Sequence, residues 1–220
     1  MKFEASDLER VFRDCFFEPD RTILVGGGDE PLYLPSSDLT RGPHRIVYRE
    51  DYIASALHEV AHWCLAGARR RRLEDYGYWY APDGRNADEQ AAFERVEARP
   101  QALEWILSDA CRFEFNLSAD NLDAGFGPSA GFAEAVAGER RRFLTRGLPP
   151  RAQRFRAALA SELAQAAEHG SERARSRCHA ALASGSSDSI RRAAPATRVA
   201  PGTPAAPGTG RRAAVTRPGA

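Results

Sequence analysis

Residues 51–67, DYIASALHEVAHWCLAG, are the most strongly patterned segment of this 220-residue chain. Its apolar residues recur three and four positions apart, as on the buried face of a helix; they are Ile53, Leu57, Val60, Ala61, Cys64 and Leu65. Asp51 suits the positive end of a helix dipole, and Gly67 is a typical helix C-cap. The sequence therefore predicts a helix whose polar side carries two histidines and a glutamate.

That polar side contains the motif HExxH, in which His58 and His62 flank Glu59. Histidines four residues apart stand one turn apart on the same face of a helix, so both imidazoles can reach one metal ion. Glu59 lies close enough to act as an acid, a base or a partner of a ligand, and it is the predicted catalytic side chain. The alternative is a half-buried helix with two histidines and no metal.

A metal ion at this motif needs a third ligand from the chain. The other histidines are poor candidates, because one lies beside a proline at a strand start and two lie at or in the C-terminal tail; they are His44, His169 and His179. The segment AAFERVEARPQALEWIL predicts a second helix, with a buried face marked by Phe93, Val96, Pro100, Leu103 and Leu107. A carboxylate on a buried face must be paired or bind a metal. We therefore predict Glu97 as the third ligand, with Glu94 in reserve.

Two histidines and one carboxylate serve two chemistries. With zinc, the set is typical of a hydrolase in which Glu59 takes a proton from water, as in HExxH metallopeptidases. With ferrous iron, it matches the ligands of oxygenases that activate O2. The spacing alone leaves both open, and a third reading is a non-catalytic, metal-stabilised binding protein.

Patterning outside the motif predicts an α+β fold, mostly helical, with a small sheet in a single domain. Strand-like runs occur at 21–25, 32–34, 45–48 and 77–80, and Gly26–Gly28 is predicted to be a turn. The opening segment is expected to be helical, because apolar residues recur there at helical spacing; they are Leu8, Val11, Phe12, Cys15 and Phe16. Further helices are expected over about 87–112, 129–146 and 150–168, and Pro100 can kink or split the first of these three. The metal helix is expected to pack beside the 87–112 segment, as in zincin-like folds.

The chain is predicted to divide into a metal-dependent domain, residues 1–169, and a disordered basic tail, residues 170–220. The tail is rich in Ala, Pro, Gly and Arg, lacks Phe, Tyr, Trp and Met, and carries a local charge of +7 against −6 for the body. Such a segment buries too little apolar surface to fold. It is either a tolerated extension or a weak electrostatic contact for RNA or an acidic protein; no other nucleic-acid contact is expected.

The cellular setting follows from what the composition excludes. No apolar run reaches the length of a membrane span, and the N-terminus is acidic and helical, unlike an export signal. The four cysteines show no CxxC spacing, as expected of free thiols. We therefore expect a cytoplasmic protein with no membrane partner.

Several segments resemble the elongation factor P hydroxylase family, in order over about residues 5–165. They are DEPLYLPSSD (29–38), RIVYREDYIASALHEVAHWCLAG (45–67), DYGYWYAPDGR (75–85), FERVEARPQALEW (93–105), FNLSADNLD (115–123) and GLPPRAQRF (147–155). The resemblance implies a monooxygenase-type oxidoreductase with Fe(II) and O2, although a purified sample can carry zinc or another divalent ion. The implied substrate is a lysine of bacterial elongation factor P that already carries a β-lysyl group.

Carried onto this sequence, the resemblance matches His58 and His62 to the metal-binding histidines of the family and places Glu97 in its FExxE…PQAL segment. A long cationic substrate side chain suits the acidic body. Candidate substrate-binding residues are Tyr78, Trp79, Asp83 and Gln101, the aromatic rings acting through cation–π contacts. The sequence contains no flavin, nicotinamide or reductase motif, so electrons are expected from an external donor.

Overall fold

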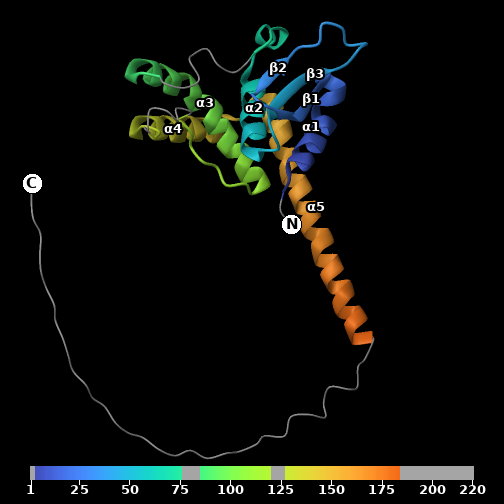
Figure 1. The fold of residues 1–220 in the computed structure, drawn as a ribbon. Helices are drawn as coiled ribbons and strands as arrows, with labels where there is room; N and C mark the ends of the chain where they lie inside the picture. The colour runs from blue at the N-terminus through green and yellow to red at the C-terminus, as the bar shows by residue number, and fades with distance from the viewer. Residues whose placement is uncertain (1–2, 76–84, 120–126, 184–220) are drawn as a thin grey trace, which may run out of the picture. The chain divides into compact units, whose positions relative to one another are not determined.

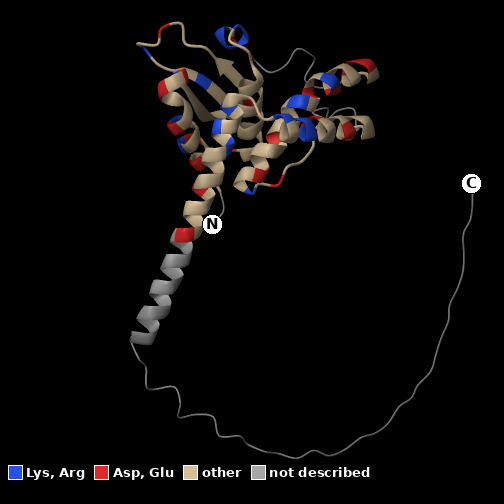
Figure 2. Cartoon of the chain, turned by 180° about the vertical axis from the view of Figure 1, so that it is seen from behind, with Lys and Arg blue, Asp and Glu red and all other residues tan. Residues whose placement is uncertain are grey.

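The computed structural model of the chain describes residues 3–75, 85–119 and 127–183, with side chains as far as residue 168. The chain forms two compact units, Met1–Ser176 and Arg177–Ala220. The first unit contains the sheet and the HExxH motif. Both signs of charge occur along the exposed faces of its helices (Figure 2).

A three-stranded sheet forms early in the chain. Its strands are β1 (Thr22–Gly28), β2 (Leu32–Leu34) and β3 (His44–Arg49), in the order β1-β3-β2. β3 runs parallel to β1 and antiparallel to β2. Strands were predicted at these three places, and the α+β fold class is confirmed.

The glycine run was predicted to be a turn, and this is wrong, because it continues β1. The register with β3 becomes irregular between Val25 and Gly28, and Gly27 has φ +90°. A Cβ on Gly26 would lie 2.6 Å from the carbonyl oxygen of Glu50 and 2.7 Å from the hydroxyl of Tyr48. Glycine is therefore needed here for close backbone approach within a strand, a use that the sequence pattern does not distinguish from a turn.

Two helices pack on the sheet. α1 (Ala5–Asp20) packs against β1, and α2 (Ile53–Leu65), the HExxH helix, packs against β3 and also reaches α3 (Ala87–Cys111). In Figure 1, α2 accordingly lies between the sheet and the green α3. Aromatic rings join these layers, because Trp63 of α2 packs edge-on against Phe12 and Phe16 of α1. The metal helix is thus held from both sides.

The C-terminal end of α2 is fixed by two arginines. Arg151 donates hydrogen bonds to the carbonyls of Trp63, Cys64 and Ala66, and Arg71 donates to that of Ala66. These carbonyls have no partner inside the helix, and cations stabilise the negative end of its dipole. Gly67 was predicted as the C-cap, which is wrong: Ala66 holds that position in extended conformation.

α3 runs unbroken through Pro100 for 25 residues. Its first turn is fixed by a capping box between Asn86 and Glu89. The predicted buried face is wrong at Val96, which is 53% exposed. The other four predicted residues, Phe93, Pro100, Leu103 and Leu107, are buried as expected. Polar side chains are buried beside them, and they are Glu97, Gln101, Glu104 and Ser108.

The remaining helices are α4 (Ala130–Arg146) and α5 (Pro150–Ala183), with a short 3₁₀ helix at Arg70–Arg72. α5 continues 15 residues past the predicted end at 168, so the predicted boundary at residue 170 falls inside a helix. No described helix is both long and apolar enough to cross a membrane. The strand predicted at 77–80 and most of the tail, 184–220, lie outside the described residues.

Candidate metal centre

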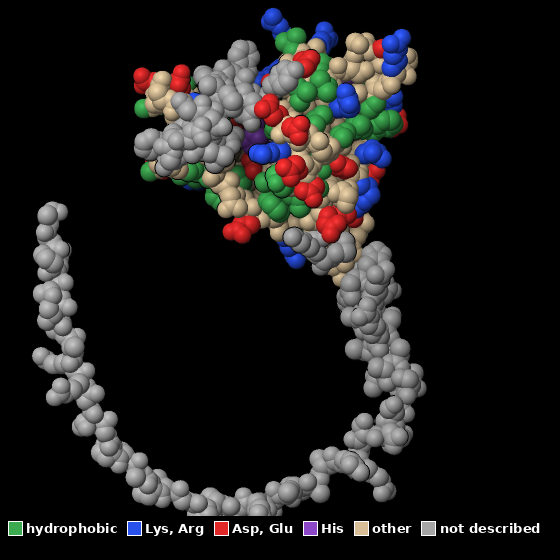
Figure 3. Space-filling view, viewed as in Figure 1, with side chains coloured by type: hydrophobic (Ala, Val, Ile, Leu, Met, Phe, Trp, Pro, Cys, Tyr) green, Lys and Arg blue, Asp and Glu red, His purple; other side chains and the backbone are tan. Residues whose placement is uncertain are grey.

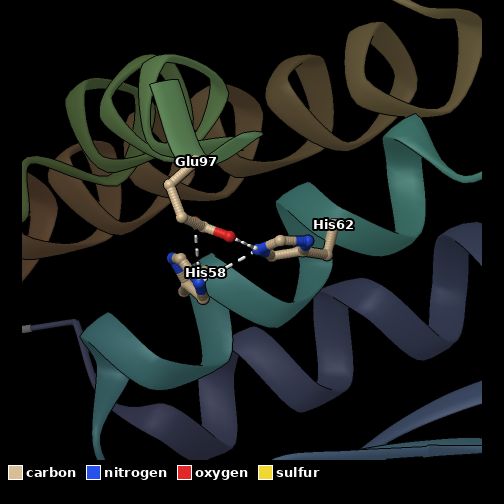
Figure 4. A group of neighbouring side chains, drawn as sticks. All are labelled: His58, His62 and Glu97. Carbon is tan, nitrogen blue, oxygen red and sulfur yellow. Dashed lines mark hydrogen bonds and ion pairs between the residues drawn. The ribbon is translucent and has the colours of Figure 1, made fainter. Parts of the chain in front are cut away.

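Three side chains from two helices converge on one point. His58 and His62 extend from α2, and Glu97 reaches them from α3 (Figure 4). The Nε2 atoms of the two histidines are 3.1 Å apart. Glu97 Oε1 lies 3.3 Å from Nε2 of His62, and Oε2 lies 3.6 Å from Nε2 of His58. Facing nitrogens and a carboxylate at such distances leave a point between them at which a single cation fits.

The helix packing explains this convergence. The two histidines are one helical turn apart, so their rings share a face. Glu97 is 5% exposed and points from the buried side of α3 toward that face. The predicted pairing of the metal helix with the 87–112 segment is therefore confirmed.

The donor atoms suit a metal ion for a further reason. Glu97 Oε2 is buried and has no hydrogen-bond partner among the described residues. Leaving a buried carboxylate oxygen unpaired is costly, and a cation would satisfy it. His58 Nδ1 is engaged by Glu104, so Nε2 is the nitrogen that faces His62 and Glu97.

The charges at the site interact strongly. Burial opposes protonation of His58, but the hydrogen bond and charge of Glu104 outweigh it and raise the pKa of His58 to about 10. Burial would raise the pKa of Glu97, yet the hydrogen bond and charge of His62 lower it below its usual value. Glu97 is therefore ionised at neutral pH, as a metal ligand must be.

Sequence comparison places this chain in a family. A family model described as "Elongation factor P hydroxylase" matches residues 11–172. The elongation factor P lysine hydroxylase of Haemophilus influenzae is 47% identical over 160 residues, which are 72% of this chain and 89% of that protein. This chain belongs to the elongation factor P hydroxylase family. The resemblance inferred from the motif segments is confirmed.

In this member of the hydroxylase family, Glu59 lies beside the metal-binding group but outside it. It lines a pocket together with Tyr33, His62, Trp63 and Asp75. Burial is the main reason why the pKa of Glu59 is raised. Its carboxyl group is therefore placed to hold or transfer a proton at the edge of the site.

The reserve ligand lies elsewhere. Glu94 accepts hydrogen bonds from the backbone N–H and the hydroxyl of Ser129, at 3.2 and 2.6 Å. Ser129 is the N-cap of α4, so Glu94 helps to fix the start of that helix. Of the two predicted carboxylates, the structure brings only Glu97 to the histidines.

Of the four predicted substrate-binding residues, the structure describes only Gln101. Gln101 is 2% exposed, and its amide exchanges two hydrogen bonds with the backbone of Ser118. It thus ties the segment after α3 to the site helix. Tyr78, Trp79 and Asp83 lie outside the described residues. The substrate-binding roles of all four stay predictions.

Sequence reasoning missed Glu104. Its Oε2 lies 2.8 Å from Nδ1 of His58, and the residue is only 7% exposed. The signal was present, because Glu104 follows Glu97 by seven residues and therefore lies on the same face of α3. Charged residues are rarely buried unless paired, so two glutamates on one buried face indicate a polar site.

The site reaches the surface on the histidine side. The side chains of His58 and His62 are 25% and 22% exposed, against 6% for Glu97. Figure 3 shows histidine atoms at the surface with acidic side chains nearby. The two histidines are therefore the more solvent-exposed part of the site, and Glu97 is its buried part.

Proposed function

We propose that this chain is an iron-dependent protein hydroxylase that acts on elongation factor P. The substrate would be the lysine that carries a β-lysyl group, and the protein would work in the cytoplasm. The observation that carries the proposal is the meeting of His58, His62 and Glu97 in a chain of this family. Two histidines and one carboxylate are the ligand set of ferrous oxygenases.

Each residue of the site has a distinct part in this proposal. His58 and His62 would hold the ion through Nε2, and Glu97 through its carboxylate. Bound Fe(II) would supply activation of O2, with one oxygen atom entering a lysine C–H bond and the other leaving as water after uptake of two electrons and two protons from an external donor. Glu59 would hold or donate a proton at the pocket edge, as its raised pKa suits.

The substrate side chain would enter beside Glu59. The pocket there combines two acidic residues, Glu59 and Asp75, with two arginines, Arg70 and Arg71, and with the rings of Tyr33 and Trp63. Carboxylates and aromatic rings attract a lysyl ammonium group through charge and cation–π contacts. Arg70 pairs with Asp75 at 2.6 Å, so an incoming ammonium group would compete with that arginine for the carboxylate.

The intact mass of elongation factor P tests the proposal. β-Lysylated elongation factor P is incubated with the protein, ferrous iron, O2 and a reductant, and it should gain the mass of one oxygen atom. The matched control is His58→Ala, which loses one ligand and should give no gain. Elongation factor P without the β-lysyl group tests the specificity.

Two results would contradict the proposal. Cleavage of a peptide bond with zinc bound, in place of a gain in mass, would point to the metallopeptidase alternative. An unchanged gain with His58→Ala would mean that the oxygen is inserted elsewhere.

A further inference from the structure

We propose that Glu104 is a positioning residue of the metal centre, which fixes the tautomer and the ring orientation of His58. The proposal rests on the metal site of the proposed function. It concerns a residue outside the HExxH motif and outside the group of three ligands.

The contact is short and specific. Glu104 Oε2 lies 2.8 Å from His58 Nδ1. A carboxylate only accepts, so the hydrogen must reside on Nδ1 of the imidazole. When the ring loses its second proton to a metal ion, Nε2 presents its lone pair toward His62 and Glu97, the direction in which the ion would lie.

Burial makes this contact rigid. Glu104 is 7% exposed and projects from α3, two turns after Glu97 on the same helix. One helix therefore supplies both a ligand and the partner of a second ligand. In metal sites, such carboxylate partners hold the ring and raise the basicity of the coordinating nitrogen.

The two histidines are consequently unequal. His58 is held between two glutamates of α3, whereas His62 borders the pocket that also contains Glu59. Glu97 lies close to both histidines, so the contact with Glu104 is what distinguishes His58. The side bordered by His62 and Glu59 is where O2 and substrate would be handled.

Ferrous iron alone, without oxygen, provides the first test. Competition with a chromogenic chelator gives the affinity of the full chain, and Glu104→Ala should lower it by about 10- to 100-fold. Glu104→Gln should fall in between, because its amide oxygen still accepts the hydrogen bond but carries no charge. The control is Glu94→Gln, which makes the same change as Glu104→Gln on the same helix but away from the site. This variant should bind iron like the wild type.

A spectroscopic test separates positioning from general stability. In zinc-loaded protein with ¹⁵N-labelled histidine, the NMR signals of His58 should show the proton on Nδ1, shifted by the carboxylate bond. Glu104→Gln, which is close to glutamate in shape, should weaken this shift in a folded protein. The wild-type measurement remains decisive if Glu104→Ala does not fold.

Two results would overturn the proposal. The first would be that both Glu104 variants bind iron as tightly as Glu94→Gln does. The second would be that the proton of His58 lies on Nε2 in the zinc-loaded wild type. Neither test uses elongation factor P. A failure of the proposed function, seen as no gain in mass, is therefore distinguishable from a failure of this inference.

Discussion

The imidazole of His58 is the most constrained group of the site. It faces Glu104 through Nδ1, and Glu97 and His62 through Nε2. In the ion-free protein these neighbours favour the protonated ring, which explains its high pKa. A metal ion must displace one proton, and it leaves the other on Nδ1 for Glu104. Metal binding and proton release are therefore coupled at this residue.

This coupling predicts a pH dependence of metal affinity. The pKa of His58 is raised to about 10, so its extra proton is present at pH 7 and competes with the ion. Affinity should rise with pH by about tenfold per unit between pH 7 and 9, and level off above the pKa. Titration calorimetry in buffers of different ionisation enthalpy should detect one proton released per ion. An affinity independent of pH over this range would contradict the assignment.

Glu59 is the proposed proton-transfer group and not a proposed ligand. It borders the pocket and lies outside the group of three ligands. Glu59→Gln should therefore keep the bound ion but lower kcat for hydroxylation by about 100-fold, because a proton-transfer group is lost. Metal content and initial rates measured on one preparation check both halves of this expectation. Loss of the ion would instead make Glu59 a ligand.

Among the two site helices, the range of each was predicted to within two residues at either end, and the error on α3 concerned one position of its buried face. The apolar spacing of 51–67 gives a helix at the right place, because burial of one stripe stabilises it. On α3, the same reasoning chose Val96 for the buried face, and the structure exposes it. Two buried glutamates, Glu97 and Glu104, lie among the apolar residues of this face. The apolar pattern led to Glu97, whereas Glu104 was missed, because hydrophobic periodicity does not mark buried polar positions.

The C-terminal end of α2, the helix that carries both histidines, is capped by Arg151. The guanidinium of Arg151 bonds three carbonyls of the helix terminus and packs 4.8 Å from the ring centre of Trp63. Arg151→Ala should lower the free energy of unfolding by about 2 kcal/mol, since several hydrogen bonds to a charged group are lost. Chemical denaturation measures the free energy of unfolding. The control is Arg156→Ala, which changes an exposed arginine of α5, the helix that also carries Arg151. Equal stability of the two variants would show that the cap is not needed.

At the level of the whole molecule, sequence patterning predicted the α+β class, three strands of the sheet and the pairing of the two site helices. It did not predict that β1 continues through Gly26–Gly28, because glycine occurs both in turns and in strands where another backbone approaches closely. It also ended α5 too early, since Ala- and Arg-rich segments extend a helix without a buried face. The zincin-like comparison stays a prediction.

The extent of the family match leads to a prediction about the tail. The match ends at residue 172, and every residue assigned to the site precedes residue 105. A chain ending at Ala183 should therefore keep the iron affinity, the melting temperature and the hydroxylation rate of the full chain. Side-by-side assays of the two proteins check this. A large loss of activity at unchanged iron affinity would instead assign the tail a part in binding the protein substrate.

The account depends on a single ion held by His58, His62 and Glu97, and equilibrium dialysis with ferrous iron tests it most directly. Glu97→Gln and Glu94→Gln remove equivalent charges from one helix, but only Glu97 faces the histidines. We predict one ion per chain for the wild type and for Glu94→Gln, and little bound iron for Glu97→Gln at the same free concentration. Equal binding by the two variants would contradict the account.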